Sequence, residues 1–230
     1  MNLQKMFEMQ KELDDRIIRE KGLEGQDLLP GLILALQVEL AECANEWRGF
    51  KFWSNDQQPC TEKEIECSLC KGTGDMNYER VAEDAEGSGG HEYIKCEECN
   101  GEGTTGTKNP LLEEYVDCLH FILSIGNQIG YLNANDVTDM QFIVAENRGV
   151  SAFGDLFNSI SSLSRELRAE SVYLSSHDKY FKRKFIERHY QEIFLRFNTL
   201  GDYLGFTPEQ IEQAYMDKNA VNHKRQQEGY

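Results

Sequence analysis

The segments Leu36-Gln-Val-Glu-Leu-Ala-Glu42 and Leu111-Leu-Glu-Glu-Tyr-Val-Asp117 decide which fold we expect for this chain. Each segment carries two carboxylates three residues apart, a spacing that projects both from one face of a helix. Both pairs stand among apolar residues, where an isolated anion is costly to bury. Two facing helices would join the pairs into one set of oxygen ligands for Mg²⁺. The alternative is two solvated acidic helix faces, which are common because Glu and Asp are usually exposed. The four carboxylates are Glu39, Glu42, Glu114 and Asp117.

Both segments belong to longer amphipathic helices. Pro30 fits the first turn of a helix that runs to about Trp47, and a second helix follows Pro110 and ends at Gly130. Apolar periodicity predicts further helices at residues 3–20, 136–147, 151–172, 178–204 and 208–226. No alternating strand pattern occurs outside residues 55–109, so we expect an all-α helical bundle.

The last predicted helix has a recognisable start. Thr207 precedes Pro208, and Gln210 follows three residues after Thr207. This arrangement is typical of a capping box, in which the side chains of the cap and of the third helical residue bond reciprocally to the backbone.

Composition narrows the possible partners. The chain has 230 residues, with 24 Lys and Arg against 40 Asp and Glu, which gives a formal net charge of −16. A surface of that sign repels nucleic acid and anionic membranes, so we expect neither as a partner. No apolar run reaches about 18 residues and the start lacks a signal-peptide core, so a cytoplasmic protein is expected.

Residues 55–109 differ from the rest of the chain, because they are polar, Gly-rich and poor in aliphatic residues. We interpret them as an insertion into the helical domain, which would consist of residues 1–54 and 110–230. The insertion contains the pattern CxxCxGxG twice, at residues 67–74 and again at residues 96–103. Two CxxC turns can supply four thiolates to one tetrahedral Zn²⁺. The predicted ligands are Cys67, Cys70, Cys96 and Cys99.

The other cysteines have simpler interpretations. Cys60 is one alternative zinc ligand, as is His91. Cys43 and Cys118 lie on apolar helix faces, where buried inert thiols are expected.

The CxxCxGxG repeat unit resembles the cysteine-rich module of J-type chaperones, although only two copies occur here where that family carries four. This resemblance implies zinc binding and not chaperone activity.

Three segments outside the insertion resemble the dimeric, all-α dUTPase family. That family belongs to the wider all-α nucleotide pyrophosphatases, which include the MazG-like proteins. The segments are residues 35–47, 112–121 and 214–226. The ExxE and ExxD pairs mark only the superfamily, whereas the His120-Phe121 step and the Tyr-Lys-Asn-Asn-Arg-Gln run near the end narrow the resemblance to dUTPases. The resemblance covers nearly all of the chain outside the insertion, and the most similar variant is found in bacteria and their phages.

The resemblance implies Mg²⁺-dependent hydrolysis of dUTP to dUMP and pyrophosphate. The four carboxylates would hold two or more Mg²⁺, and either Glu42 or Glu46 would orient the attacking water. The chemistry agrees, because phosphoanhydride cleavage mainly needs positioning and charge neutralisation.

The resemblance also assigns residues to the substrate. Base recognition would fall on Gln10, His120 and Phe121, and Asp14 points from the same helix face as Gln10. His120 lies one turn beyond Asp117, so it should line the same pocket. The alternatives are an exposed helix residue for Gln10 and a packed core histidine for His120.

One face of the last predicted helix is rich in amides. Lys218 and Arg225 would meet phosphates, and Asn222 the sugar or base; a solvated terminal helix is the alternative. The polar residues on this face are Tyr215, Lys218, Asn219, Asn222 and Gln226.

The resemblance further implies a homodimer. Lys51 and Trp53 follow the first carboxylate helix and would contact phosphates or the neighbouring subunit. The insertion would serve as a dimer contact, a lid or a docking surface for a regulator. Two rival functions stay open: a dCTP or mixed dNTP hydrolase on the same fold, and an interaction protein that binds a regulator through its zinc module.

Overall fold

The computed structural model describes residues 1–77, 92–131, 149–168 and 176–229. The chain divides into two compact units, one formed by Met1–Pro59 with Leu111–Tyr230 and the other by Cys60–Pro110. The helix expected at residues 136–147 lies outside the described residues, as do His91 and the end of the helix expected at 151–172.

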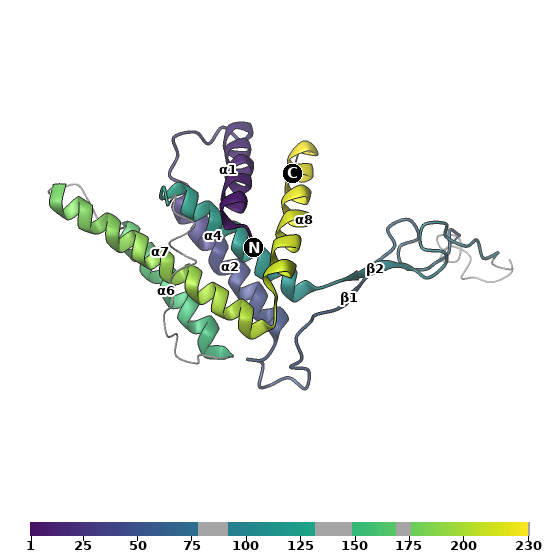
Figure 1. Cartoon of the computed structure of the whole chain (residues 1–230). Helices are drawn as coiled ribbons and strands as arrows, with labels where there is room; N and C mark the ends of the chain where they lie inside the picture. The colour runs from purple at the N-terminus through teal and green to yellow at the C-terminus, as the bar shows by residue number, and fades with distance from the viewer. Residues whose placement is uncertain (78–91, 132–148, 169–175, 230) are drawn as a thin grey trace. The chain divides into compact units, whose positions relative to one another are not determined.

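The first unit is helical, which confirms the predicted fold class. The described helices are α1 (Leu3–Glu20), α2 (Leu29–Trp47), α4 (Pro110–Gln128), α6 (Val150–Arg168), α7 (Ser176–Leu204) and α8 (Pro208–Gln227) (Figure 1). The other expected helices are found with bounds shifted by at most two residues. Helix α6 packs against α7, α2 against α6, and α1 against α8.

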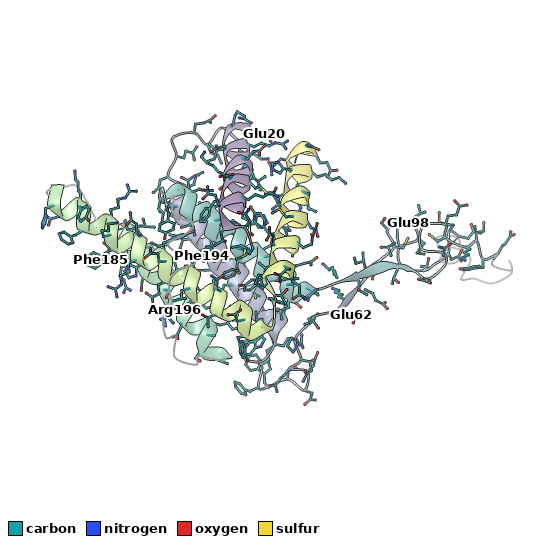
Figure 2. All side chains as sticks on the ribbon, viewed as in Figure 1. Glu20, Glu62, Glu98, Phe185, Phe194 and Arg196 are labelled. Carbon is teal, nitrogen blue, oxygen red and sulfur yellow. The ribbon has the colours of Figure 1, made fainter. Side chains whose placement is uncertain are left out.

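Aromatic residues fix how α4 and α7 pack. The ring of Tyr115 on α4 stacks on Phe197 of α7 with ring centroids 4.1 Å apart, and its hydroxyl donates to the Phe197 carbonyl at 3.0 Å. Gly201 permits this approach, because a Cβ there would lie 2.3 Å from the Tyr115 hydroxyl oxygen. Farther back along α7, Phe194 is buried whereas Phe185 is half exposed (Figure 2). The carboxyl-terminal half of α7 therefore supplies the core contacts that position α4.

Local signals in the sequence account for the helix ends. The Asn2 side chain accepts from the Lys5 backbone N–H and caps α1. The capping box predicted at α8 is confirmed, with Thr207 Oγ1 accepting from Gln210 N and Gln210 Oε1 accepting from Thr207 N. Helix α2 ends at Trp47, because the next residue, Arg48, has a left-handed φ of 63° that stops the helical hydrogen-bond pattern.

The second unit is built on a short antiparallel pair, β1 (Lys63–Glu66) and β2 (Thr104–Lys108). Beyond the pair, the chain brings four cysteine side chains into one cluster. The fold is thus an all-α bundle that carries a small inserted four-cysteine module. No helix in the described ranges is long and apolar enough to cross a membrane.

Candidate active site and cysteine cluster

The structure brings three of the four predicted carboxylates together. Glu39 and Glu42 project from α2 and Glu114 from α4, and one oxygen from each lies within 4.8 Å of the others. The three-residue spacing on α2 explains why its two carboxylates share a face. Oxygen atoms at this separation suit a hard divalent cation such as Mg²⁺.

The fourth carboxylate, Asp117, forms an ion pair with a lysine side chain. Its Oδ2 accepts a charge-assisted hydrogen bond at 2.5 Å from the ammonium of Lys218 on α8. Both side chains are mostly shielded, with 18% exposure for Asp117 and 24% for Lys218. Asp117 is therefore not one of the three clustered carboxylates, but it lies near enough to repel two of them, Glu39 and Glu114.

The cluster is electrostatically strained without a metal. The pKa of Glu39 is raised to about 7, first by burial and then by repulsion from Asp117 and Glu42. The pKa of Glu114 is raised to about 7 by burial and by the same two neighbours, with Glu39 adding to the effect. Lys218 offsets part of each shift. A bound divalent cation would relieve this repulsion, so the residues present fit Mg²⁺.

A cavity of about 380 Å³ opens beside the carboxylates. Its walls come from four helices, α1, α2, α4 and α8, together with the segment between α1 and α2. Among the substrate-binding residues expected from the sequence, those that line it are Gln10, Asp14, His120, Phe121, Lys218, Asn222, Arg225 and Gln226.

A hydrogen-bond network at the cavity orients His120. The Gln10 amide nitrogen donates to Asp14 Oδ1 at 2.9 Å and to Ser124 Oγ at 3.0 Å, so its oxygen faces the other way. That oxygen lies 2.7 Å from His120 Nδ1 and 3.1 Å from the Tyr215 hydroxyl. Because an amide oxygen only accepts, His120 Nδ1 carries the proton.

A lowered pKa keeps the imidazole of His120 neutral, so its other nitrogen, Nε2, has one lone pair to offer. Burial, followed by the charge of Lys218, lowers its pKa to about 3. Tyr215 stacks on the ring with centroids 4.4 Å apart and holds its plane. Within the described residues, Nε2 is buried without a hydrogen-bond partner. A ligand in this cavity can supply the missing donor.

Three further buried atoms lack a partner in the described part of the chain; His189 Nδ1 lies on α7, and the other two belong to Asp14 and Asn219. Asp14 Oδ2 is an acceptor, and burial raises the pKa of Asp14 to about 6 even though Gln10 and Ser124 donate to the other oxygen. Asn219 Nδ2 is a donor. Asn219 and Tyr215 are buried on α8 and are not among the residues that line the cavity. Unsatisfied buried polar atoms are rare in folded proteins, and the one on Asp14, which lines the cavity, is available to a ligand there.

The comparison with known families agrees with this geometry. The sequence model of the family described as dUTPase matches residues 2–68 and 101–230. The chain belongs to the dUTPase family. Among curated proteins, no significant match was found. Membership supports a nucleotide pyrophosphatase that acts on a nucleotide substrate with divalent metal, and the carboxylate cluster is consistent with it.

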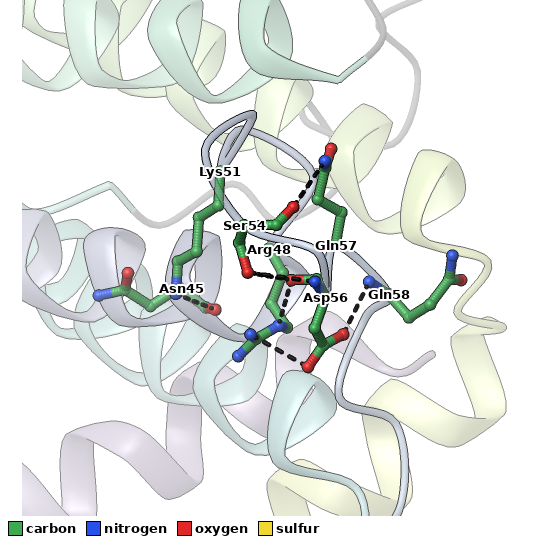
Figure 3. A network of polar contacts seen from close by, with 7 residues as sticks. All are labelled: Asn45, Arg48, Lys51, Ser54, Asp56, Gln57 and Gln58. Atoms are coloured by element: carbon green, nitrogen blue, oxygen red, sulfur yellow. Dashed lines mark hydrogen bonds and ion pairs between the residues drawn. The ribbon is translucent and has the colours of Figure 1, made fainter.

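Other expected site residues of this dUTPase-family protein lie outside the cavity. Glu46 is half-buried one turn beyond Glu42 and is not part of the three-carboxylate cluster. Lys51 lies in the loop after α2, where its ammonium donates to the Asn45 carbonyl at 3.2 Å (Figure 3). The same loop is held by Arg48, which forms an ion pair with Asp56 at 3.1 Å. This loop presents Trp53 with 66% of its surface exposed.

Some lining residues were not singled out from the sequence. Ser124 lies one turn after His120 on α4, so helical spacing could have found it, but an uncharged Ser in an apolar run gave no chemical signal. The apolar wall looks like ordinary core in the sequence. It consists of Leu13, Ile17, Ile18, Leu23, Leu28 and Leu32.

The family match leaves out residues 69–100, which contain three of the four clustered cysteines, Cys70, Cys96 and Cys99. Cys67 Sγ lies 3.7 Å from Cys96 Sγ, and Cys70 Sγ lies 3.7 Å from Cys99 Sγ. All four thiols are free and buried. Cys60 is half-buried and lies outside this cluster.

The two halves of the cluster repeat each other in structure as in sequence. Gly74 N donates to Cys70 Sγ and Gly103 N donates to Cys99 Sγ, both at 3.2 Å. The backbones also interlock, since Cys67 N donates to the Gly103 carbonyl and Cys96 N to the Gly74 carbonyl. N–H donors of this kind stabilise thiolate charge, so the four sulfurs can bind a metal ion.

Proposed function

We propose that this dUTPase-family protein hydrolyses dUTP to dUMP and pyrophosphate with Mg²⁺. The observation that carries the choice of base is the buried, neutral His120, whose Nε2 is an acceptor without a partner among the described residues. Uracil offers a donor, N3–H, on its pairing edge, whereas cytosine has an acceptor at N3. A cytosine would set two lone pairs against each other in a buried place, which costs more than a lost contact.

The other base contacts follow from this arrangement. Phe121 lines the cavity and offers a ring on which uracil can stack. Gln10 uses both ends of its amide inside the protein, so it acts on the base by holding the His120 tautomer. A close-fitting wall would reject the extra methyl of dTTP, although one methyl group contributes only roughly 1–3 kcal/mol of discrimination.

The carboxylates supply the phosphate end of the site. Glu39, Glu42, Glu114 and Asp117 would hold two or more Mg²⁺, which when bound neutralise phosphate charge and lower the pKa of a water. Glu42 or Glu46 accepts the proton of the attacking water and orients it towards the α-phosphorus. Lys218 and Arg225 meet the phosphate oxygens from α8, and Asn222 contacts the sugar or base. Preorganised charge of this kind is usually the largest contribution to catalysis of phosphoryl transfer.

We also propose that the cysteine module holds one Zn²⁺. Zinc–thiolate bonds are about 2.3 Å long, so two sulfurs on a tetrahedral zinc lie about 3.8 Å apart. The two observed sulfur–sulfur distances of 3.7 Å support this metal. Metal analysis of the purified protein tests it: one zinc per chain is expected, and four thiols that all react freely would exclude it.

The functional molecule is proposed to be a homodimer, as the family resemblance implies. Leu34 and Val38 on one face of α2 support this, because they are 61% and 46% exposed in the single chain. Light scattering after size-exclusion chromatography would test the mass.

The decisive experiment is pyrophosphate release from each of dUTP, dTTP, dCTP and dATP, with and without Mg²⁺. We expect dUTP to react first, with dTTP and dCTP far behind and no turnover without metal. Glu39→Gln and Asp117→Asn should abolish turnover with the fold intact, because each removes charge and little volume. Equal rates on all four nucleotides would refute the dUTP assignment and support the mixed hydrolase. No hydrolysis of any of them would favour the interaction protein.

A further inference from the structure

Lys218 stands at the border between the metal site and the cavity. Its ammonium pairs with Asp117 at 2.5 Å, and its side chain lines the same cavity as Glu39 and His120. Helix α8 also places Asn222 and Arg225 along this cavity, so the helix delivers a row of polar groups to one place. One cation thus lies within reach of both a metal ligand and the space for a substrate.

The pairing matters because the neighbouring carboxylates are crowded. Glu39 and Glu114 experience repulsion from Asp117, and Lys218 reduces it for both. A lysine ammonium can balance these charges from one point, but it cannot coordinate several oxygens at once as a divalent cation does. Lysine also has a flexible four-carbon stem, so its head can move by several ångströms without a backbone change.

We propose that Lys218 is an internal counter-ion that neutralises Asp117 in the metal-free protein and transfers to the phosphates of the substrate when Asp117 takes up metal. The inference deepens the proposed function and rests on it for the identity of the phosphate ligand. Its consequence is coupling between two binding events. Metal releases Lys218 for phosphate, and phosphate removes Lys218 from competition for Asp117, so each ligand strengthens the binding of the other.

The test separates the two halves of this exchange with Lys218→Met, which keeps the length of the side chain and removes its charge. Calorimetric titration of the nucleotide-free protein with Mg²⁺ should show about tenfold tighter binding in Lys218→Met than in the unmodified protein, because the competitor for Asp117 is gone. Titration with inorganic pyrophosphate at saturating Mg²⁺ should show about tenfold weaker binding, because the same cation is missing.

Two control variants have clear expectations. Lys224→Met removes an exposed lysine six residues later on α8, which forms a 3.7 Å ion pair with the exposed Glu228 and does not line the cavity. Both affinities should stay unchanged in this variant. Lys218→Arg keeps the charge, so its affinities for Mg²⁺ and for pyrophosphate should stay close to those of the wild type. Tighter Mg²⁺ binding together with weaker pyrophosphate binding, seen in Lys218→Met and in neither control, would support the exchange. Unchanged or weaker Mg²⁺ binding in Lys218→Met would overturn it.

A measurement on the unmodified protein covers the case in which Lys218→Met fails to fold. The ¹⁵N side-chain resonance of a lysine ammonium reports its hydrogen bonding, and Lys218→Arg identifies the signal by its loss. Addition of Mg²⁺ alone should shift that resonance, and an unmoved resonance at saturating Mg²⁺ would also overturn the proposal. Because neither this experiment nor the metal titration contains a nucleotide, failure of the dUTP assignment would leave both results interpretable.

Discussion

His120 Nδ1 lies 2.7 Å from Gln10 Oε1, although 110 positions separate the two residues in the chain. The contact joins α1 to α4 and determines which nitrogen of the imidazole carries the proton. Because Gln10 is held in turn by Asp14 and Ser124, the amide cannot simply turn over and offer its nitrogen. Under the proposed function, the selectivity of the site for a base would be set through Gln10, whose own polar atoms are all engaged within the protein.

The first prediction concerns this positioning role. Gln10→Leu removes the acceptor for Nδ1–H, so His120 can place its proton on either nitrogen and present a donor as well as an acceptor. We expect the ratio of kcat/KM for dUTP over dCTP to fall at least about tenfold. Loss of the buried hydrogen bonds should also lower stability by about 1–3 kcal/mol. Gln4→Leu, on the exposed side of α1, is the control and should change neither quantity. An equal loss of rate on both nucleotides would show that Gln10 serves stability alone.

The second prediction uses the raised pKa values of the carboxylates. Glu39 and Glu114 have pKa values of about 7 in the folded protein, against an ordinary value of 4.5. The folded state therefore binds protons more tightly than the unfolded chain, and each group lowers the free energy of unfolding as pH rises from 4.5 to 7. Glu114→Gln removes one of them. Without metal, the free energy of unfolding of this variant should equal that of the wild type near pH 4.5 and exceed it by about 1 kcal/mol above pH 7. The difference stays this small because solvent screens a half-buried site.

Urea unfolding in the presence of EDTA, at several pH values, measures this difference. Glu12→Gln on the exposed face of α1 is a suitable control and should show no such pH trend relative to the wild type. A Glu114→Gln variant that is less stable than the wild type at pH 8 would contradict the repulsion argued for the cluster.

The third prediction concerns the effect of Mg²⁺ on the stability of the wild type and of Glu114→Gln. Under the proposed function, Mg²⁺ would bind the folded carboxylate cluster and not the unfolded chain, and would therefore stabilise the fold by linkage. Millimolar Mg²⁺ should raise the Tm of the wild type by roughly 5 °C, and by clearly less in Glu114→Gln. Differential scanning calorimetry at fixed ionic strength separates this effect from screening. The metal site would be contradicted by a wild-type Tm that stays constant over a full Mg²⁺ titration in which NaCl keeps the ionic strength fixed.

Helical periodicity in the sequence was sufficient to predict most of the helices and part of the site. Leu3, Met6, Phe7 and Leu13 recur at helical spacing, and all four are buried on α1. The same rule places Glu39 with Glu42 on one face and His120 one turn after Asp117. These relationships are local, since they depend only on the geometry of a single helix.

Contacts between helices could not be obtained in this way. The pairing of Asp117 with Lys218 depends on how α8 packs, and spacing within α4 contains no information about it. For the same reason the sequence suggested that Gln10 meets the base directly, whereas its amide is occupied by Asp14, Ser124 and His120. The insertion, expected at residues 55–109, corresponds to a compact unit that begins at Cys60, because Arg48 and Asp56 hold the preceding loop to the end of α2.

The last prediction concerns the glycines of the cysteine module. Gly74 has a φ of +75°, and a Cβ there would lie 2.2 Å from the Gly101 carbonyl oxygen, a backbone atom of the other half of the repeat. Gly74→Ala should therefore push the two halves apart and misplace the N–H that donates to Cys70 Sγ. It should weaken zinc binding at least about tenfold more than the left-handed backbone cost alone would. Gly72→Ala is the matched comparison. Its φ of +79° is equally left-handed, but the nearest atoms to its Cβ belong to the flexible Glu66 side chain at 3.6 Å. It should show only the backbone cost of about 1–2 kcal/mol. Competition with a colorimetric zinc chelator measures both affinities. Equal losses in the two variants would mean that left-handed backbone strain, and not the close approach of the two halves, governs the site.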